Sequence, residues 1–225
     1  MKNNFLFLAI ACLTVQFAAA QTTQTRSFMI GPTFGLNKTS YVTDGTYSGF
    51  PTVQAPAGAF GGLDASYQLN HWLLGAKLLY QKQTYQATYP PFEYIIGDGP
   101  LPPAIYRTDT DYHLLSLPFS VGYRLTPGTR LQWFLGGTVE FNYTAETGQQ
   151  TMFTSTGIHT VTDKATFGPV LDLGYGAQTT LRYAVSPQVA LQFEPAVRYN
   201  PKDGYLLRAR ESYQLRGAFS VLVKL

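Results

Sequence analysis

The sequence predicts an all-β fold, an eight-stranded antiparallel transmembrane β-barrel with short periplasmic turns and long extracellular loops. Apolar and polar residues alternate in segment after segment up to the last residue, Leu225. Charged residues make up 13% of the chain, about half the roughly 25% of soluble proteins, while aromatic residues make up 15%. Beyond the N-terminal segment, no apolar run approaches the about 20 residues that a membrane helix needs.

Residues 1–20 are expected to be a cleaved export signal. Lys2 gives the start a positive charge, residues 5–13 are apolar, and residues 18–20 are the three alanines that a signal peptidase would accept. The apolar run is too short to cross a bilayer. Residues 21–225 then form one domain, the barrel, and the expected location is the outer membrane.

Cys12 is the only cysteine. It lies in a stretch that resembles a lipidation box, so a lipoprotein is an alternative, although lipidation there would shorten the apolar run. If cleavage follows residue 20, the mature chain has no cysteine, which excludes disulfides and thiol chemistry. The formal net charge of +3 is too small to predict nucleic-acid binding.

Residues 212–225 alternate most strictly, with Tyr213, Leu215 and Phe219 on one face and polar residues on the other. Period two over such a length is typical of a strand. The same pattern occurs in residues 130–145 and 188–200. Weaker versions cover residues 27–38, 57–69, 72–85, 110–125 and 166–185. Strands this long exceed those of soluble sheets and suit tilted membrane strands.

The connections between these segments are of two kinds. Three are tight, at residues 70–71, 126–129 and 186–187. Four are long, at residues 39–56, 86–109, 146–165 and 201–211. Short turns on one rim and long loops on the other are typical of outer-membrane barrels, in which the short turns are periplasmic.

Aromatic residues on the outward face gather at both ends of the strands. Those near the short turns are Tyr67, Trp72, Tyr123, Trp133 and Tyr183, and those near the long loops are Tyr80, Tyr143, Tyr199 and Tyr213. Amphipathic rings settle at both membrane interfaces, so we expect two aromatic belts.

The inward face is expected to hold an interior charge network. Its members are Asp64, Lys77, Arg124, Arg130, Glu140, Asp172, Arg182, Glu194, Arg198, Arg216 and Lys224. Eight strands enclose a space that side chains can fill, and confined charges need partners. We expect Glu194 to pair with Arg216 and Glu140 to lie near Arg198. The favoured interpretation is a plugged interior, and the alternative is a gated ion or proton path.

Two groups of polar residues at the outer rim are catalytic candidates. They are Asp109, Asp111 and His113, and Ser155, His159 and Asp163. Catalysis needs converging geometry, which sequence proximity does not provide. Scattered histidines without cysteine give no metal-ligand spacing. We therefore expect no enzyme activity, no metal and no cofactor.

The loop after the third predicted strand is rich in proline and aromatic residues. Tyr89, Phe92 and Tyr94 lie in it, among five prolines within residues 90–103. A stiffened aromatic loop on a rigid scaffold suits recognition. The alternative is that the loop folds over the barrel mouth as a lid.

Three stretches resemble the PorT-type outer-membrane β-barrel domain family. Residues 115–119, followed by Gly122 and Tyr123, are similar to that family's proline-containing strand, residues 79–82 to its third strand and residues 31–37 to its first. The terminal Leu225 departs from the aromatic residue common at this place. The resemblance implies an eight-stranded barrel, and a few members of the family are linked to protein secretion.

The expected function is that of an integral outer-membrane β-barrel protein with a plugged polar interior, which acts in binding or envelope structure through its extracellular loops. Membrane lipid is its expected partner, and we expect a monomer. One alternative is an accessory component of a protein-secretion or envelope-assembly machine. A second is a rim enzyme acting on lipid or peptide. A third is a soluble lipocalin-like carrier, whose barrel would have its apolar face inside.

Overall fold

The computed structural model describes most of the region after the expected signal. The described residues are 26–43, 52–89, 105–127, 130–145, 150–154, 157–161, 170–201 and 209–225. Residues 1–20 lie outside them, as do Phe92 and Tyr94. Within the described ranges, no helix combines the length and the apolar character needed to cross a membrane.

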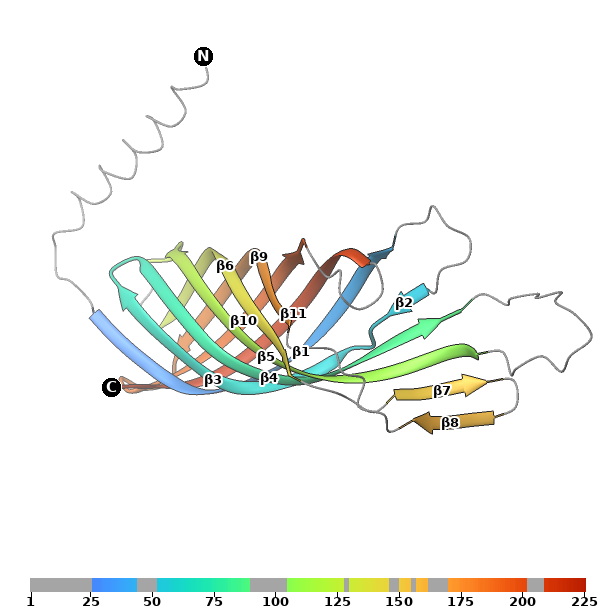
Figure 1. The fold of residues 1–225 in the computed structure, drawn as a ribbon. Helices are drawn as coiled ribbons and strands as arrows, with labels where there is room; N and C mark the ends of the chain where they lie inside the picture. Colours follow the sequence, from blue (N-terminus) through green and yellow to red (C-terminus); the bar gives the residue numbers. More distant parts are fainter. Residues whose placement is uncertain are drawn as a thin grey trace, which may run out of the picture.

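Eight strands close into a ring, which Figure 1 shows from the side. In order around the ring they are β1 (Arg26–Thr43), β3 (Gly58–Leu69), β4 (Trp72–Thr88), β5 (Ile105–Arg124), β6 (Leu131–Ala145), β9 (Val170–Ala184), β10 (Val189–Asn200) and β11 (Ala209–Lys224). Every neighbouring pair is antiparallel, and the β1–β11 pairing closes the ring. The predicted fold class is confirmed.

Three short strands lie in segments that the sequence assigned to loops. They are β2 (Thr52–Gln54), which pairs with β4, and the β7 (Gln150–Thr154) and β8 (Gly157–Val161) hairpin, which pairs with β5 through β7. The loop prediction was wrong there. Because β4 and β5 run past the ring, their outer halves expose unpaired edges, and these short strands cover them (Figure 1).

The register shows how strongly the strands are staggered. Following the Cα partners once around the ring from Ile30 leads through Ala65, Ala76, Phe119, Val139, Tyr175, Tyr199 and Tyr213 to Ser40. The path therefore returns to β1 ten residues beyond its start. Such a stagger tilts the strands and leaves an interior that side chains can fill.

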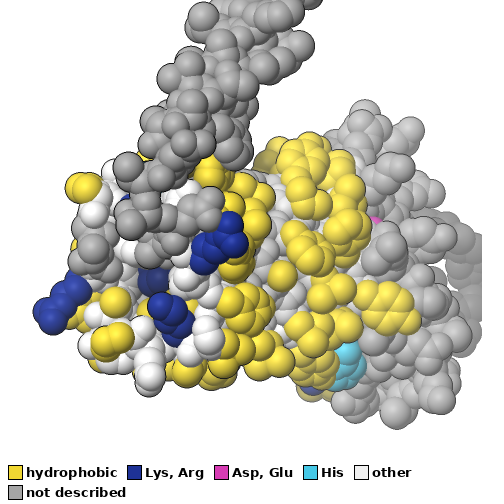
Figure 2. Space-filling view, turned by 90° about the vertical axis from the view of Figure 1, so that its left-hand side faces the viewer, with side chains coloured by type: hydrophobic (Ala, Val, Ile, Leu, Met, Phe, Trp, Pro, Cys, Tyr) yellow, Lys and Arg dark blue, Asp and Glu magenta, His cyan; other side chains and the backbone are white. Residues whose placement is uncertain are grey.

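The two faces of the wall differ in chemistry. On β11, Leu215 and Val223 point outward and are exposed, whereas Gln214 and Arg216 point inward and are buried. Figure 2 shows hydrophobic side chains spread over one face of the molecule, with most of the visible Lys and Arg side chains to one side of them. An apolar exterior over a polar interior is the reverse of a soluble carrier, so the lipocalin-like alternative is wrong.

The β3–β4 connection is a two-residue turn at Asn70 and His71. Asn70 has a φ of 54°, in the left-handed region that asparagine tolerates better than most residues. The β9–β10 turn is held by Ser186, whose Oγ accepts hydrogen bonds from the backbone N–H groups of Gln188 (3.2 Å) and Val189 (3.0 Å). These short turns connect neighbouring strands at one rim of the barrel.

Candidate functional site

The half of the interior nearer the short turns, called the lower half, is built around Lys77. Its Nζ lies 3.1 Å from Asp64 Oδ2 and 2.8 Å from Glu194 Oε1. Lys77 comes from β4, Asp64 from the adjacent β3, and Glu194 from β10 on the far side of the ring. All three are buried. The pair with Glu194 therefore crosses the space inside the barrel.

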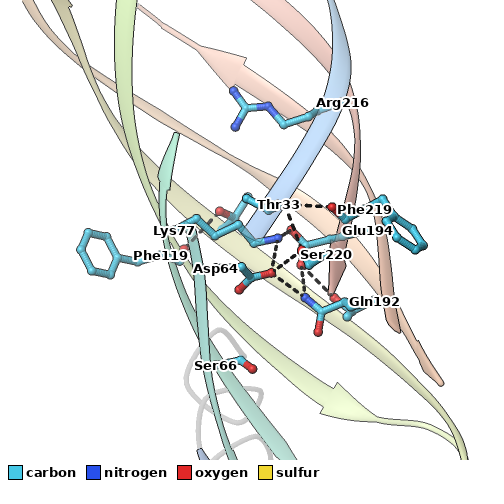
Figure 3. Close-up of polar contacts among 12 residues, drawn as sticks. Thr33, Asp64, Ser66, Lys77, Phe119, Gln192, Glu194, Arg216, Phe219 and Ser220 are labelled. Carbon is cyan, nitrogen blue, oxygen red and sulfur yellow. Dashed lines mark hydrogen bonds and ion pairs between the residues drawn. The ribbon is translucent and has the colours of Figure 1, made fainter. Parts of the chain in front are cut away.

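Neutral polar side chains complete this cluster, as Figure 3 shows. Asp64 Oδ2 accepts hydrogen bonds from Gln192 Nε2 at 3.0 Å and from Ser220 Oγ at 2.8 Å. Arg182 donates to Gln192 Oε1 at 2.7 Å and to Ser66 Oγ at 2.8 Å. We call Asp64, Lys77, Arg182 and Glu194 the lower cluster. Its two cations and two carboxylates balance, which suits a structural plug.

A second group, the upper cluster, consists of Glu140, Arg198 and Arg216. Arg216 Nη2 lies 3.0 Å from Glu140 Oε1, and Arg198 forms an ion pair with Oε2 of the same carboxylate. Glu140 and Arg198 do lie together. The predicted pair of Glu194 with Arg216 is wrong, because Lys77 reaches Glu194 from the opposite wall and Arg216 turns to Glu140.

Other predicted members of the network lie elsewhere. Arg124 and Asp172 are half-buried, and Asp172 has an interaction of its own. Arg130 precedes β6 and is exposed, and Lys224 is exposed at the end of β11. Arg130 and Lys224 therefore belong to the periplasmic rim and not to the buried interior. Alternation gave them inward parity, but each lies at the end of its strand, where the wall no longer encloses it.

The periplasmic end of the interior is apolar, which the sequence analysis missed. Met29, Ala190 and Leu222 form a buried cluster there, and Phe134 and Leu73 are also buried. These residues occupy inward positions close to the short turns. The signal was available in the sequence, since Leu222 interrupts the polar face of the last strand.

The aromatic belts can be followed along the wall. Near the short turns, Trp72 and Tyr123 form an edge-on pair with ring centroids 5.2 Å apart. Near the long loops, Tyr175, Tyr199 and Tyr213 form a row across β9, β10 and β11 with centroid separations of 5.4 and 5.1 Å. Tyr175 was not among the predicted belt residues, because it lies in the middle of the predicted strand, residues 166–185. The stagger of the strands places it level with Tyr199 and Tyr213. Tyr67, Trp133, Tyr183, Tyr80 and Tyr143 also point outward.

Beyond the outer belt, β4 and β5 carry a line of outward polar contacts. Lys82 Nζ lies 2.6 Å from Asp111 Oδ2, and Thr84 Oγ1 donates to Asp111 Oδ1 at 2.6 Å. Partial burial raises the pKa of Asp111, but the hydrogen bonds from Lys82 and Thr84 outweigh it and hold that pKa below its ordinary value. The hydrogen bond to Asp111 also raises the pKa of Lys82.

The candidate catalytic residues on β5 each have a partner of another kind. His113 Nδ1 lies 2.6 Å from the Tyr80 hydroxyl, and the two rings stack. Asp109 Oδ1 and Oδ2 accept hydrogen bonds from Arg107 at 2.7 and 2.6 Å. Ser155 and Asp163 lie outside the described residues, and His159 is placed only by its backbone in β8. In the part of the chain that is described, no three His, Cys, Asp or Glu side chains gather as metal ligands would.

The closed ring, its filled interior and its two aromatic belts define a small transmembrane β-barrel. A family model for the outer membrane protein beta-barrel domain matches residues 5–205. The chain belongs to this family of outer-membrane barrels.

Solved structures of similar form come from several Gram-negative bacteria. OprG from Pseudomonas aeruginosa has a TM-score of 0.47 at 13% identity, with 91% of this chain and 98% of that chain covered. Neisserial surface protein A has a TM-score of 0.45 at 18% identity, covering 89% and 99%. Ail of Yersinia pestis has a TM-score of 0.45 at 9% identity, covering 91% and 100%. None of the curated proteins matches the chain.

Proposed function

We infer that this protein acts by binding at the cell surface and in envelope structure, through the sheet and loops on its extracellular side. One observation supports this function above the others. Past the outer aromatic belt, β4 and β5 continue and combine with β2, β7 and β8 into a sheet outside the ring, while cross-barrel ion pairs fill the interior. A rigid support for loops outside a filled barrel suits recognition better than transport.

The aromatic loop begins on this sheet. Tyr89 lies directly after β4, and its backbone N–H donates to the carbonyl oxygen of Tyr106 at 2.9 Å. This hydrogen bond fixes the base of the segment that carries Phe92 and Tyr94. Aromatic side chains are frequent anchors of protein interfaces. Tyr89, Phe92 and Tyr94 are the residues we propose for recognition.

We further infer that the protein is not an enzyme and works as a monomer in outer-membrane lipid. The contacts on β5 support the first point, because His113, Asp109 and Asp111 are engaged with Tyr80, Arg107 and Lys82. A general base needs an accessible substrate proton within hydrogen-bond reach. Replacing His113 with glutamine should therefore leave any activity of the purified protein unchanged.

The test of this function has two arms. In planar lipid bilayers the wild-type protein should give no steady conductance, and a steady conductance would overturn the plugged interior. Purified from native outer membranes in mild detergent, it should come out as a monomer. A stoichiometric envelope or secretion protein in the same fraction would replace surface binding with the role of an accessory component, which the PorT-type resemblance also fits.

A further inference from the structure

The upper cluster has one positive charge more than its partners neutralise. Arg198 and Arg216 both contact Glu140, and the three side chains are among the most buried of the described residues, with 3%, 5% and 1% of their surfaces exposed. Because both guanidinium groups touch the same carboxylate, they lie close to one another. The lower cluster, by contrast, pairs two cations with two carboxylates.

The surrounding described wall does not supply the missing negative charge. The register partners of Arg216 are Asn37 and Ala196, and those of Arg198 are Gln214 and Gly176. Gln214 accepts one hydrogen bond from Arg216 Nη2 at 2.8 Å but carries no charge.

Two further carboxylates lie on strands β10 and β9. Glu194 accepts from Lys77 Nζ at 2.8 Å and from Thr180 at 3.3 Å. Asp172 lies on β9 toward the mouth and has an interaction of its own. Glu194 thus forms its ion pair with Lys77 and not with Arg198 or Arg216.

Both arginines also keep buried donors without a partner in the structure. These are Nε of Arg198 and Nε of Arg216. A buried donor without an acceptor is costly, the more so when the group is charged. Native interiors rarely leave two such donors in one place without a ligand or water.

The adjacent wall of β9 carries no side chain between Glu140 and Arg198. On β9 the inward positions beside Glu140 and Arg198 are Gly174 and Gly176, which carry no side chain. This gap in the lining allows Glu140 on β6 to reach Arg198 on β10.

We propose that the upper cluster holds a compact monovalent anion of the size of chloride, bound by Arg198 and Arg216. One negative charge balances the cluster, and a spherical acceptor can receive N–H donors from two directions at once. A multivalent anion would leave excess negative charge beside Glu140.

The direct test uses bromide, whose anomalous scattering locates it. Crystals of the folded protein grown or soaked in bromide should show an anomalous peak within hydrogen-bond distance of nitrogen atoms of Arg198 and Arg216. A peak absent from this place, or water alone at it, overturns the site.

A second measurement follows stability in solution at constant ionic strength. The urea midpoint of wild-type protein in detergent should rise when chloride or bromide replaces gluconate. Arg198→Gln leaves Glu140 and Arg216 balanced, so this rise should be lost, whereas Glu140→Gln adds to the excess charge and should enlarge it. Gln192→Leu, beside the lower cluster, is the control and should keep the wild-type rise. Equal midpoints in halide and gluconate for the wild type, or an undiminished rise in Arg198→Gln, would refute the assignment.

Discussion

Lys77 and Glu194 lie on strands separated by three others in either direction around the ring, and yet their Nζ and Oε1 atoms are 2.8 Å apart. An ion pair that joins opposite walls leaves no open lumen at its level. Asp64, Gln192 and Ser220 surround it with further hydrogen bonds. The barrel is therefore held together across its middle as well as along its strand ladder.

This cross-barrel pair predicts a large effect on stability. Lys77→Met should destabilise the folded barrel by about 3–5 kcal/mol, because it leaves Asp64 and Glu194 buried without their cation. Lys82→Met is the matched control on the same strand, since the Lys82 side chain is 58% exposed and its pair with Asp111 faces outward. Urea titration of protein folded into lipid vesicles measures both. Equal losses of stability in the two variants would show that the buried ion pair of Lys77 stabilises the fold no more than the exposed pair of Lys82 does.

Two adjacent glycines on β3 give a second matched pair. A Cβ at the inward Gly62 would overlap the carbonyl oxygen of Leu78 on β4, whereas a Cβ at the outward Gly61 meets nothing closer than Thr33 O at 3.9 Å. Gly62→Ala should cost on the order of 1–3 kcal/mol through overpacking, and Gly61→Ala should be nearly neutral. The fraction that keeps the fast-migrating folded form on unheated gels reports the difference. A neutral Gly62→Ala would mean that β3 and β4 approach less closely.

The placement of the membrane can be tested with arginine substitutions on the outer wall. Leu63 is 52% exposed and lies midway between the aromatic belts, whereas Ser40 pairs with Tyr213 of the outer belt. Arginine on the lipid face costs about 2–4 kcal/mol at the midplane and about 0–1 near the interfaces. Leu63→Arg should therefore weaken folding into vesicles far more than Ser40→Arg. The reverse order would move the bilayer along the barrel.

The contact of Lys82 with Asp111 predicts a pH dependence outside the membrane. The pKa of Asp111 is lowered in the folded protein, so its stabilising effect is present above the ordinary pKa of 3.8 and is lost as the pH falls through the lower folded value. At neutral pH, Asp111→Asn should speed hydrogen exchange in the outer halves of β4 and β5.

In acid, below the folded pKa of Asp111, the variant and the wild type should exchange alike, since protonated aspartic acid loses the same ion pair. Comparing the two proteins at each pH removes the intrinsic pH effect on exchange. A difference in exchange rate between the variant and the wild type that grows as the pH falls would contradict this prediction.

Alternation allowed the sequence to predict which side of the wall each strand residue faces, because side-chain direction in a strand depends only on parity. It did not predict which inward residues meet. Arg216 and Glu194 lie on adjacent strands, but the partner of Glu194 comes from the opposite wall, and that choice depends on the ten-residue stagger. The stagger is a property of the closed ring that no single segment contains.

The short strands β7 and β8 were also not predicted from the sequence. β7 and β8 have five residues each, which is too short for a reliable period-two signal. They form because β5 already offers them an edge. Arg130 and Lys224 show the same dependence on context in the opposite direction, since their parity is inward but the wall ends beside them.

The outer halves of β4 and β5 extend the protein beyond the membrane surface. Eight residues of β4, from Gln81 to Thr88, follow the belt residue Tyr80. At about 3.4 Å per residue they extend roughly 27 Å along the strand, and even strongly tilted they clear the headgroup layer, which is only about 5–8 Å thick on each side. Any partner caught at the far end would be held away from the lipid surface, on an arm stiffened by backbone hydrogen bonds on both of its edges.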